Sequence, residues 1–198
     1  MALNYALASI VTCVFLACSM PAFADGSRSS SERGDLESYN RACRIGNKAV
    51  ELAKRGDYFG AVKLDREAIA INPRDAVWHH NLGNDLEKLG KLDEAIKEQQ
   101  NAINLDPNML AAWLAKGMEY ELQRKFKSAE QCYRESVRIS SKSYGALGCL
   151  GDILRKQGKF ADAEKWLEEA KASPGAVYAP VGEIEKKLFQ CRHKDSSD

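Results

Sequence analysis

Residues suited to catalysis and metal binding are scarce in this sequence. Its 198 residues include three histidines, and two of them, His79 and His80, are adjacent, so they would point to different sides of a helix. No Cys-x-x-Cys pair and no cluster of Cys with His is present, which argues against a zinc site and against thioredoxin-like redox chemistry. The glycine patterns that bind nucleotide phosphates are also missing. We therefore predict that the protein is not an enzyme, and we assign it no catalytic residue, no metal site and no cofactor.

An excess of charge of one sign is lacking as well. The 29 Lys and Arg against 28 Asp and Glu give a formal net charge of +1, and the two signs are interleaved along the chain. Electrostatics therefore gives no reason to expect nucleic acid or an anionic membrane surface as a partner. The composition, 44% hydrophobic and 29% charged, is ordinary for a globular domain with a core.

Long hydrophobic runs are confined to the N-terminus, where residues 6–17 are mostly apolar. That run is too short to span a bilayer comfortably, and Pro21 and the triplet Ala22-Phe23-Ala24 follow it in the order of a secretory signal peptide. We expect residues 1–24 to be a signal peptide, which leaves an exported protein, periplasmic or secreted, with no integral membrane span. The alternative is a lipoprotein with lipid attached at Cys18, because "FLAC" resembles the bacterial lipobox.

What the sequence does contain is a repeat. The segment "GDYFGAVKLDREAIAINP" at 56–73 returns as "GKLDEAIKEQQNAINLDP" at 90–107. A fixed period of this kind predicts stacked supersecondary units that share one core. A shift of 34 residues aligns small residues and prolines: Ala61 with Ala95, Ala129 and Ala163; Ala49 with Gly83, Gly117 and Gly151; and Pro73 with Pro107.

The residues between these marks predict a pair of helices in each unit. In the second unit, Leu82, Leu86 and Leu89 recur at helical spacing and form one apolar stripe. Gly90 then ends the helix, because glycine tolerates the left-handed conformation that a helix end often needs. The third unit has Arg124 where its neighbours have glycine, so we expect a less sharply defined turn there.

This pattern of small residues, turn glycines and prolines resembles the tetratricopeptide repeat, a helix-turn-helix unit. The resemblance implies an all-α fold, a right-handed α-solenoid of about four such repeats with a C-terminal capping helix. The stripe Val181, Ile184 and Leu188 predicts the capping helix over 181–191. The expected organisation is a disordered Ser-rich tether at 25–35, a repeat array at 36–175 with units at about 42–75, 76–109, 110–143 and 144–175, and the capping helix with a tail at 176–198.

The resemblance also implies a surface for a partner. In tetratricopeptide arrays the first helices of successive units line a concave groove, which commonly receives an extended peptide or a partner helix. One variant of the family grips the carboxylate end of chaperone tails with Lys, Asn and Arg, but Gly46, Val50, Ala111 and Ala115 stand at the positions concerned, so we expect that clamp to be absent. By repeat position, the groove would include His80, Asn84, Glu87, Lys88, Leu114, Met118, Glu121, Leu122, Asp152, Arg155 and Lys156.

One part of this groove is apolar. The third unit presents Leu114, Met118 and Leu122 at successive helical turns, and Gly145 and Gly148 of the fourth unit face them without side chains. An apolar strip with a charged rim is typical of a binding hot spot. The alternative interpretation is that the two leucines pack against a neighbouring helix.

We therefore predict a protein–protein interaction scaffold or adaptor of the cell envelope or secreted space, with a protein or peptide as partner. Two alternatives stay open. The first is self-association, in which Cys43 and Cys191 mediate head-to-tail stacking. The second is a ligand-binding or catalytic protein that uses His80, Asn84 and Asp152 across the groove.

Cys132 and Cys149 fall on neighbouring helices by the repeat alignment. A disulfide between them requires α-carbons within about 7 Å and side chains that face each other. The two residues are therefore either a disulfide, which an exported protein could form, or two buried thiols.

The signal-peptide hypothesis predicts a mature protein that begins at Asp25 and lies outside the cytoplasm. Intact-mass measurement on protein isolated from its native host tests this. A retained Met1 in a cytosolic fraction would contradict export, and an added lipid mass on Cys18 would favour the lipoprotein alternative.

Overall fold

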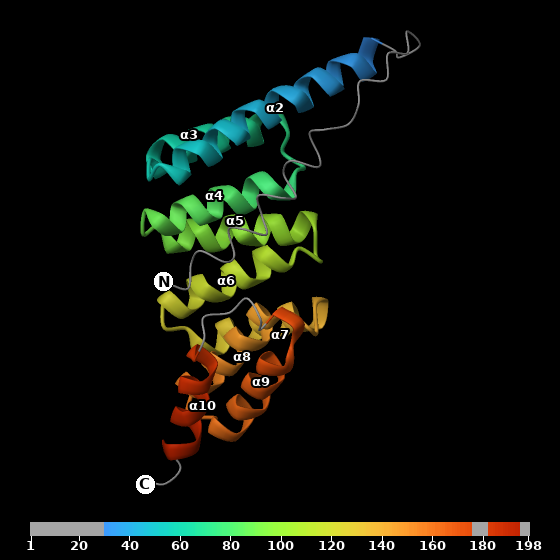
Figure 1. The fold of residues 1–198 in the computed structure, drawn as a ribbon. Helices are drawn as coiled ribbons and strands as arrows, with labels where there is room; N and C mark the ends of the chain where they lie inside the picture. Colours follow the sequence, from blue (N-terminus) through green and yellow to red (C-terminus); the bar gives the residue numbers. More distant parts are fainter. Residues whose placement is uncertain (1–29, 176–181, 195–198) are drawn as a thin grey trace. The chain divides into compact units, whose positions relative to one another are not determined.

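The computed structural model describes residues 30–175 and 182–194, and these residues form α-helices and no β-strand, so the predicted all-α helical repeat fold is confirmed (Figure 1). The predicted signal peptide lies outside the described residues. The helices fall into two compact units, divided between Arg74 and Asp75. In chain order the helices are α2 (Ser30–Lys54), α3 (Tyr58–Ile71), α4 (Ala76–Lys88), α5 (Leu92–Leu105), α6 (Leu110–Leu122), α7 (Phe126–Ile139), α8 (Tyr144–Lys156), α9 (Phe160–Ala172) and α10 (Glu183–Lys194).

The first unit is the helix pair α2 and α3, which pack closely because Ala42 and Ala49 on one helix and Ala61 and Ala68 on the other are fully buried. The helix α2 begins at Ser30, so residues 30–35 are helical and the prediction of a disordered tether over them is wrong. No proline stands between residue 30 and the buried stretch of α2, and the one glycine there, Gly34, weakens the helix without ending it, so the helix extends toward the N-terminus beyond the part that packing holds.

The second unit contains three helix pairs, α4 with α5, α6 with α7, and α8 with α9, and each helix packs on the next along the chain. One pair occupies each of the segments 76–109, 110–143 and 144–175. The last helix, α10, packs against α9 and buries Ile184, Leu188 and Cys191 in the same core cluster as Leu150 and Leu167. It therefore covers the apolar surface that the last pair would otherwise expose. No described helix is both long enough and apolar enough to cross a membrane.

The turn inside each pair has the same geometry even where the sequence departs from glycine. Gly90 has φ of 75°, and the next residue, Lys91, donates its N–H to the Leu86 carbonyl at 2.9 Å. Arg124 takes the equivalent place with φ of 58°, and its successor makes the same 2.9 Å bond. The expectation of a less defined turn in the third repeat, residues 110–143, is therefore wrong. The flanking helices impose the left-handed conformation on arginine at a cost of about 1–2 kcal/mol.

Three glycines allow the helices of each pair to approach closely. A β-carbon on Gly83 would lie 2.5 Å from the Gln99 side chain, and one on Gly117 would lie 2.4 Å from the Tyr133 ring. In the next pair the corresponding distance, from Gly151 to Leu167, is 2.7 Å. All three distances are shorter than real β-carbon contacts, so a side chain at any of these positions would force its neighbour to shift.

The helix α8 offers a matched test of this requirement, because Gly148 lies one turn from Gly151 and a β-carbon there would meet nothing within 4 Å. We expect Gly148→Ala to raise the free energy of unfolding by about 1 kcal/mol, the difference in helix propensity. Gly151→Ala should lower it by about 1–3 kcal/mol, because Leu167 would have to move. Urea unfolding of both variants measures the two effects, and changes of the same sign would contradict this account of the packing.

Candidate functional site

Within the second unit, the first helices α6 and α8 carry the apolar part of the predicted groove. We call Leu114, Met118 and Leu122 of α6, together with Gly145 and Gly148 of α8, the contact face. Leu122 is 59% exposed, whereas Leu114 and Met118 are half-buried and pack against the core cluster. The alternative that the leucines pack against a neighbour thus holds for Leu114 and fails for Leu122.

The α8 part of the contact face is open. Among the described residues, a β-carbon on Gly148 would have no neighbour within 4 Å, and one on Gly145 would meet only the Ser143 hydroxyl at 4.0 Å. Gly151 on the same helix is held to glycine by Leu167, but neither Gly145 nor Gly148 is restricted in this way. Folding of the described chain therefore gives no steric reason for glycine at these two positions.

Charged residues join α6 to α8 beside the contact face. The Lys156 ammonium pairs with the carboxylate of Glu121, one repeat earlier, and with Asp152 Oδ2 at 2.9 Å. Arg155 contacts Asp152 Oδ1 at 2.7 Å. Burial alone would raise the pKa of Asp152, but its hydrogen bonds from Lys156 and Arg155 and the charge of Lys187 hold the pKa below its usual value. The structure thus brings four of the predicted site residues together as one ionised network.

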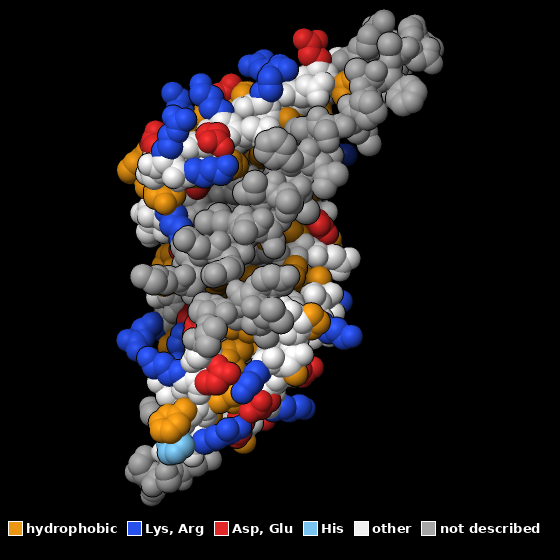
Figure 2. Space-filling model, in the orientation of Figure 1, with side chains coloured by type: hydrophobic (Ala, Val, Ile, Leu, Met, Phe, Trp, Pro, Cys, Tyr) orange, Lys and Arg blue, Asp and Glu red, His pale blue; other side chains and the backbone are white. Residues whose placement is uncertain are grey.

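The C-terminal helices have a surface of mixed charge. In Figure 2, acidic and basic side chains lie side by side over the C-terminal helices, with hydrophobic side chains visible between them.

Two other predicted groove residues form a local pair on α4, where Lys88 contacts the adjacent Glu87 at 3.2 Å. No sign of charge dominates the predicted residues.

His80 and Asn84 do not form an accessible site. His80 is 2% exposed, and its Nδ1 lies 2.8 Å from Gln99 Oε1 while its Nε2 lies 3.1 Å from Asn84 Nδ2. Since an amide oxygen can only accept, Nδ1 carries the proton and Nε2 accepts from Asn84. Burial lowers the pKa of His80, so the ring is neutral. The prediction that His80 lines a partner-binding surface is therefore wrong, because its ring serves to satisfy buried polar groups.

The catalytic alternative would need His80 as its general base, but both ring nitrogens of His80 are already hydrogen-bonded within the chain. His80 is committed to Gln99 and Asn84, and Asp152 is committed to the ion pairs with Lys156 and Arg155. No group of three or more His, Cys, Asp or Glu side chains that could hold a metal ion occurs in the described part of the chain.

Cys132 and Cys149 are free cysteines in the structure, so the disulfide considered from the sequence is not formed. Burial raises the pKa of the Cys132 thiol to about 11 and that of the Cys149 thiol to about 12. Both groups are therefore protonated at neutral pH and are poor nucleophiles.

Sequence reasoning missed Glu119, a fully buried acid on α6. Burial raises its pKa to about 8, and the nearby Glu87 carboxylate adds to the rise. Neither of its carboxyl oxygens accepts a hydrogen bond of normal geometry from the described residues. The repeat register contained the signal, because a shift of 34 residues aligns Glu119 with Ile153, a core residue.

Glu119→Gln should remove a pH dependence of stability. The unfolded chain ionises Glu119 near pH 4.5 while the folded chain keeps its proton up to about pH 8, so the folded state of the parent loses stability as pH rises between these values. Glutamine cannot ionise, so we expect the variant to exceed the parent by at least about 1 kcal/mol at pH 8 and to match it closely at pH 4.5.

Urea unfolding at the two pH values measures this difference, with Glu169→Gln, an exposed glutamate on α9, as the control. Equal pH dependence in parent and Glu119→Gln would show that Glu119 is ionised in the folded state at neutral pH.

Comparisons with known proteins agree with this architecture. Two tetratricopeptide repeat family models match residues 76–109 and 123–177. The chain is 30% identical over 130 residues to Hsp70-Hsp90 organizing protein 1 of Glycine max. This alignment covers 63% of this chain and 23% of that protein. It is 28% identical over 118 residues to Hsp70-Hsp90 organizing protein 3 of Arabidopsis thaliana, over 60% of this chain and 21% of that protein. The chain thus spans less than a quarter of the length of these relatives.

Solved structures share the fold. The first TPR of Spaghetti (RPAP3), bound to the HSP90 peptide SRMEEVD, has a TM-score of 0.57 at 19% identity and covers 59% of this chain and 93% of its own. The second TPR domain of human RPAP3, in complex with the HSP70 peptide SGPTIEEVD, has a TM-score of 0.56 at 22% identity. It covers 59% of this chain and 97% of its own. Helix pairs at a 34-residue interval, glycines at the helix contacts, and two family models over residues 76–109 and 123–177 together show the family: the chain is a tetratricopeptide repeat protein.

Proposed function

We propose that the protein is an interaction adaptor that binds a segment of a partner protein on the contact face of α6 and α8. The observation that carries the proposal is the open surface at Gly145 and Gly148 of α8, to which Leu122 of α6 adds an exposed leucine. Each glycine inside a helix costs about 1 kcal/mol relative to alanine, and Gly148 gains no internal contact in return. A partner backbone that approaches α8 closely would use the space that a side chain would fill.

The chemistry of the face favours an apolar segment with mixed charges at its edges. Leu122 offers an exposed apolar anchor. The ion pairs of Glu121, Asp152 and Lys156 form a border with both signs of charge, so a positive or a negative side chain of a partner can bind there. The arrangement is that of a small hot spot with a polar rim.

The acidic tails bound by the structural neighbours fit this face poorly. The peptides named for the two RPAP3 structures both end in Glu-Glu-Val-Asp. In this chain Ala111 and Ala115 stand on α6 where the chaperone-tail clamp would need basic side chains. We therefore propose a partner segment of a different chemistry, in which apolar side chains carry the affinity.

The proposal includes a location in the cell envelope or the secreted space. Its support is the signal-peptide pattern of residues 1–24, which also suits the lack of a chaperone-tail clamp, since the chaperones concerned would not be met after export.

Leu122→Glu should reduce capture of the partner from native-host extract by at least about tenfold, equivalent to about 1.4 kcal/mol, because it places a charge on the exposed anchor. Leu105→Glu is the matched control: Leu105 is also an exposed leucine, at 40%, but lies on the second helix α5, away from the contact face. Quantitative mass spectrometry of the captured proteins measures both variants.

Met118→Glu and Gly148→Leu complete the test. Met118 is half-buried against the core, so its variant must first be shown to melt like the parent; Gly148→Leu fills open space and should fold normally while it blocks close approach. Undiminished capture by folded Leu122→Glu and Gly148→Leu would rule out this face.

A further inference from the structure

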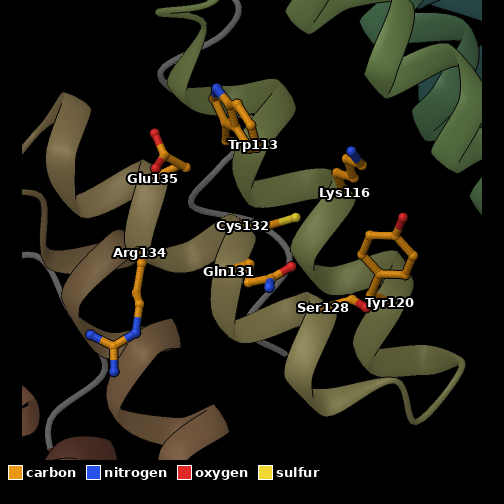
Figure 3. A pocket seen from close by; sticks show the side chains of 8 residues that line it. All are labelled: Trp113, Lys116, Tyr120, Ser128, Gln131, Cys132, Arg134 and Glu135. Carbon is orange, nitrogen blue, oxygen red and sulfur yellow. The ribbon is translucent and has the colours of Figure 1, made fainter.

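A pocket of about 490 Å³ opens between α6 and α7. Its volume lies within the range of small-molecule sites, about 300–1,000 Å³. Figure 3 shows the rings of Trp113 and Tyr120 and the stem of Lys116 along the α6 side, with Cys132 and Gln131 opposite them on α7. Ser128, Arg134 and Glu135 complete the lining.

The pocket is separate from the contact face. Trp113, Lys116 and Tyr120 lie on one side of α6, and at about 100° per residue they are roughly 165° around the helix from the centre of the contact-face residues of α6. The two sites share no side chain, so the pocket does not depend on the proposed adaptor function.

Lys116 is a charged residue at a buried position. The 34-residue register aligns it with Leu82 and Leu150, which are 3% and 1% exposed in the core, and with Lys48 of α2, which is exposed. Lys116 is itself only 9% exposed. Leucine packs well at this position in the α4–α5 and α8–α9 pairs, and the lysine of α2 stays in solvent, so a buried lysine at this position occurs in α6 alone among these four helices.

The buried ammonium of Lys116 has no ion-pair partner among the described residues. It donates a hydrogen bond to the amide oxygen of Gln100 and lies 5.7 Å from the Trp113 ring centre and 5.8 Å from that of Tyr120. An ammonium group has three N–H donors, so two remain after the bond to Gln100. The nearest acid on its own helix, Glu119, is largely protonated at neutral pH, because burial raises its pKa to about 8.

The other charges of the lining are neutralised within the chain. Glu135 accepts a bond from Arg138 at 2.7 Å, and Arg134 pairs with Glu130 at 2.8 Å. The Arg134 side chain also points away from the other lining residues (Figure 3). Cys132 is a neutral thiol, so it adds no charge and no nucleophile. Lys116 is thus the lining residue whose charge an incoming ligand can still compensate.

We propose that this pocket binds a small organic carboxylate with a flat, apolar body. The carboxylate would pair with the Lys116 ammonium, and the body would lie against the Trp113 and Tyr120 rings, with the Gln131 amide and the Ser128 hydroxyl within the same lining as further polar groups. A cationic ligand does not fit, because Lys116 already occupies the position over both rings that a cation would take.

The test is a titration of the full mature chain with 3-phenylpropionate and with its uncharged analogue 3-phenylpropionamide, followed by amide chemical shifts in NMR spectra. We expect the acid to bind with a Kd below about 1 mM and at least about tenfold more tightly than the amide. Lys116→Leu, which installs the residue found at the equivalent positions 82 and 150, should fold, lose the tenfold preference and leave binding of the amide unchanged.

Lys165→Met is the matched control, because Lys165 also lies 5.7 Å from a tryptophan ring centre, that of Trp166, but stands on α9 outside the pocket. A second pocket variant, Gln131→Glu, adds a negative charge at an exposed lining residue and should weaken binding of the acid at least about threefold without a change in melting temperature. Equal binding of acid and amide, equal effects of Lys116→Leu and Lys165→Met, or no saturable binding would each overturn the proposal. None of these outcomes bears on the contact face, which the Leu122 variant tests separately.

Discussion

The spacing of the helices in the second unit depends on one repeated contact, between a glycine on the first helix of each pair and a large side chain on the second. It occurs at Gly83 with Gln99, at Gly117 with Tyr133 and at Gly151 with Leu167. The glycine is fixed because a β-carbon would come too close to the partner, whereas an amide, a phenol and an aliphatic side chain all serve as the partner. Once this contact sets the distance between helices, the remaining positions of each helix can vary with function.

The side chain that contacts the glycine differs from pair to pair. With it the core of the second unit changes from polar at α4 and α5 to apolar at α8 and α9. Gln99 brings His80 and Asn84 into a buried hydrogen-bond network at α4 and α5, while the equivalent Leu167 sits among leucines at α8 and α9. Buried polar groups add little net stability even when they are satisfied, and Glu119 lacks such satisfaction. The α4–α6 part of the unit is therefore held less firmly than the α8–α10 part, where apolar burial dominates.

The sequence predicted the parts of this structure that backbone geometry controls. Gly90 marks a left-handed helix end, and the aligned alanines and glycines mark close helix contacts, so the period, the helix pairs and the fold class could be inferred. The surroundings of individual side chains could not. His80 was assigned to an accessible groove by its place in the repeat, but Gln99 on the following helix draws it into the core, and this pairing depends on two residues 19 apart whose contact the period does not reveal. The ion pair of Lys156 with Glu121 was equally invisible, although both residues were predicted to lie in one site.

Comparison of equivalent positions, rather than of the repeat as a whole, is what separates structural residues from residues under another constraint. Where leucine recurs, a lysine such as Lys116 signals a chemical requirement, and where a side chain would fit freely, a glycine such as Gly148 signals a spatial one. Lys116 lies on α6 and Gly148 on α8. The Gly117–Tyr133 contact holds α6 closely against α7, and the two sites share no side chain, so a ligand at one site could influence the other only by shifting α6. The pocket on α6 and α7 and the contact face on α6 and α8 are therefore best understood as independent sites that share the helix α6.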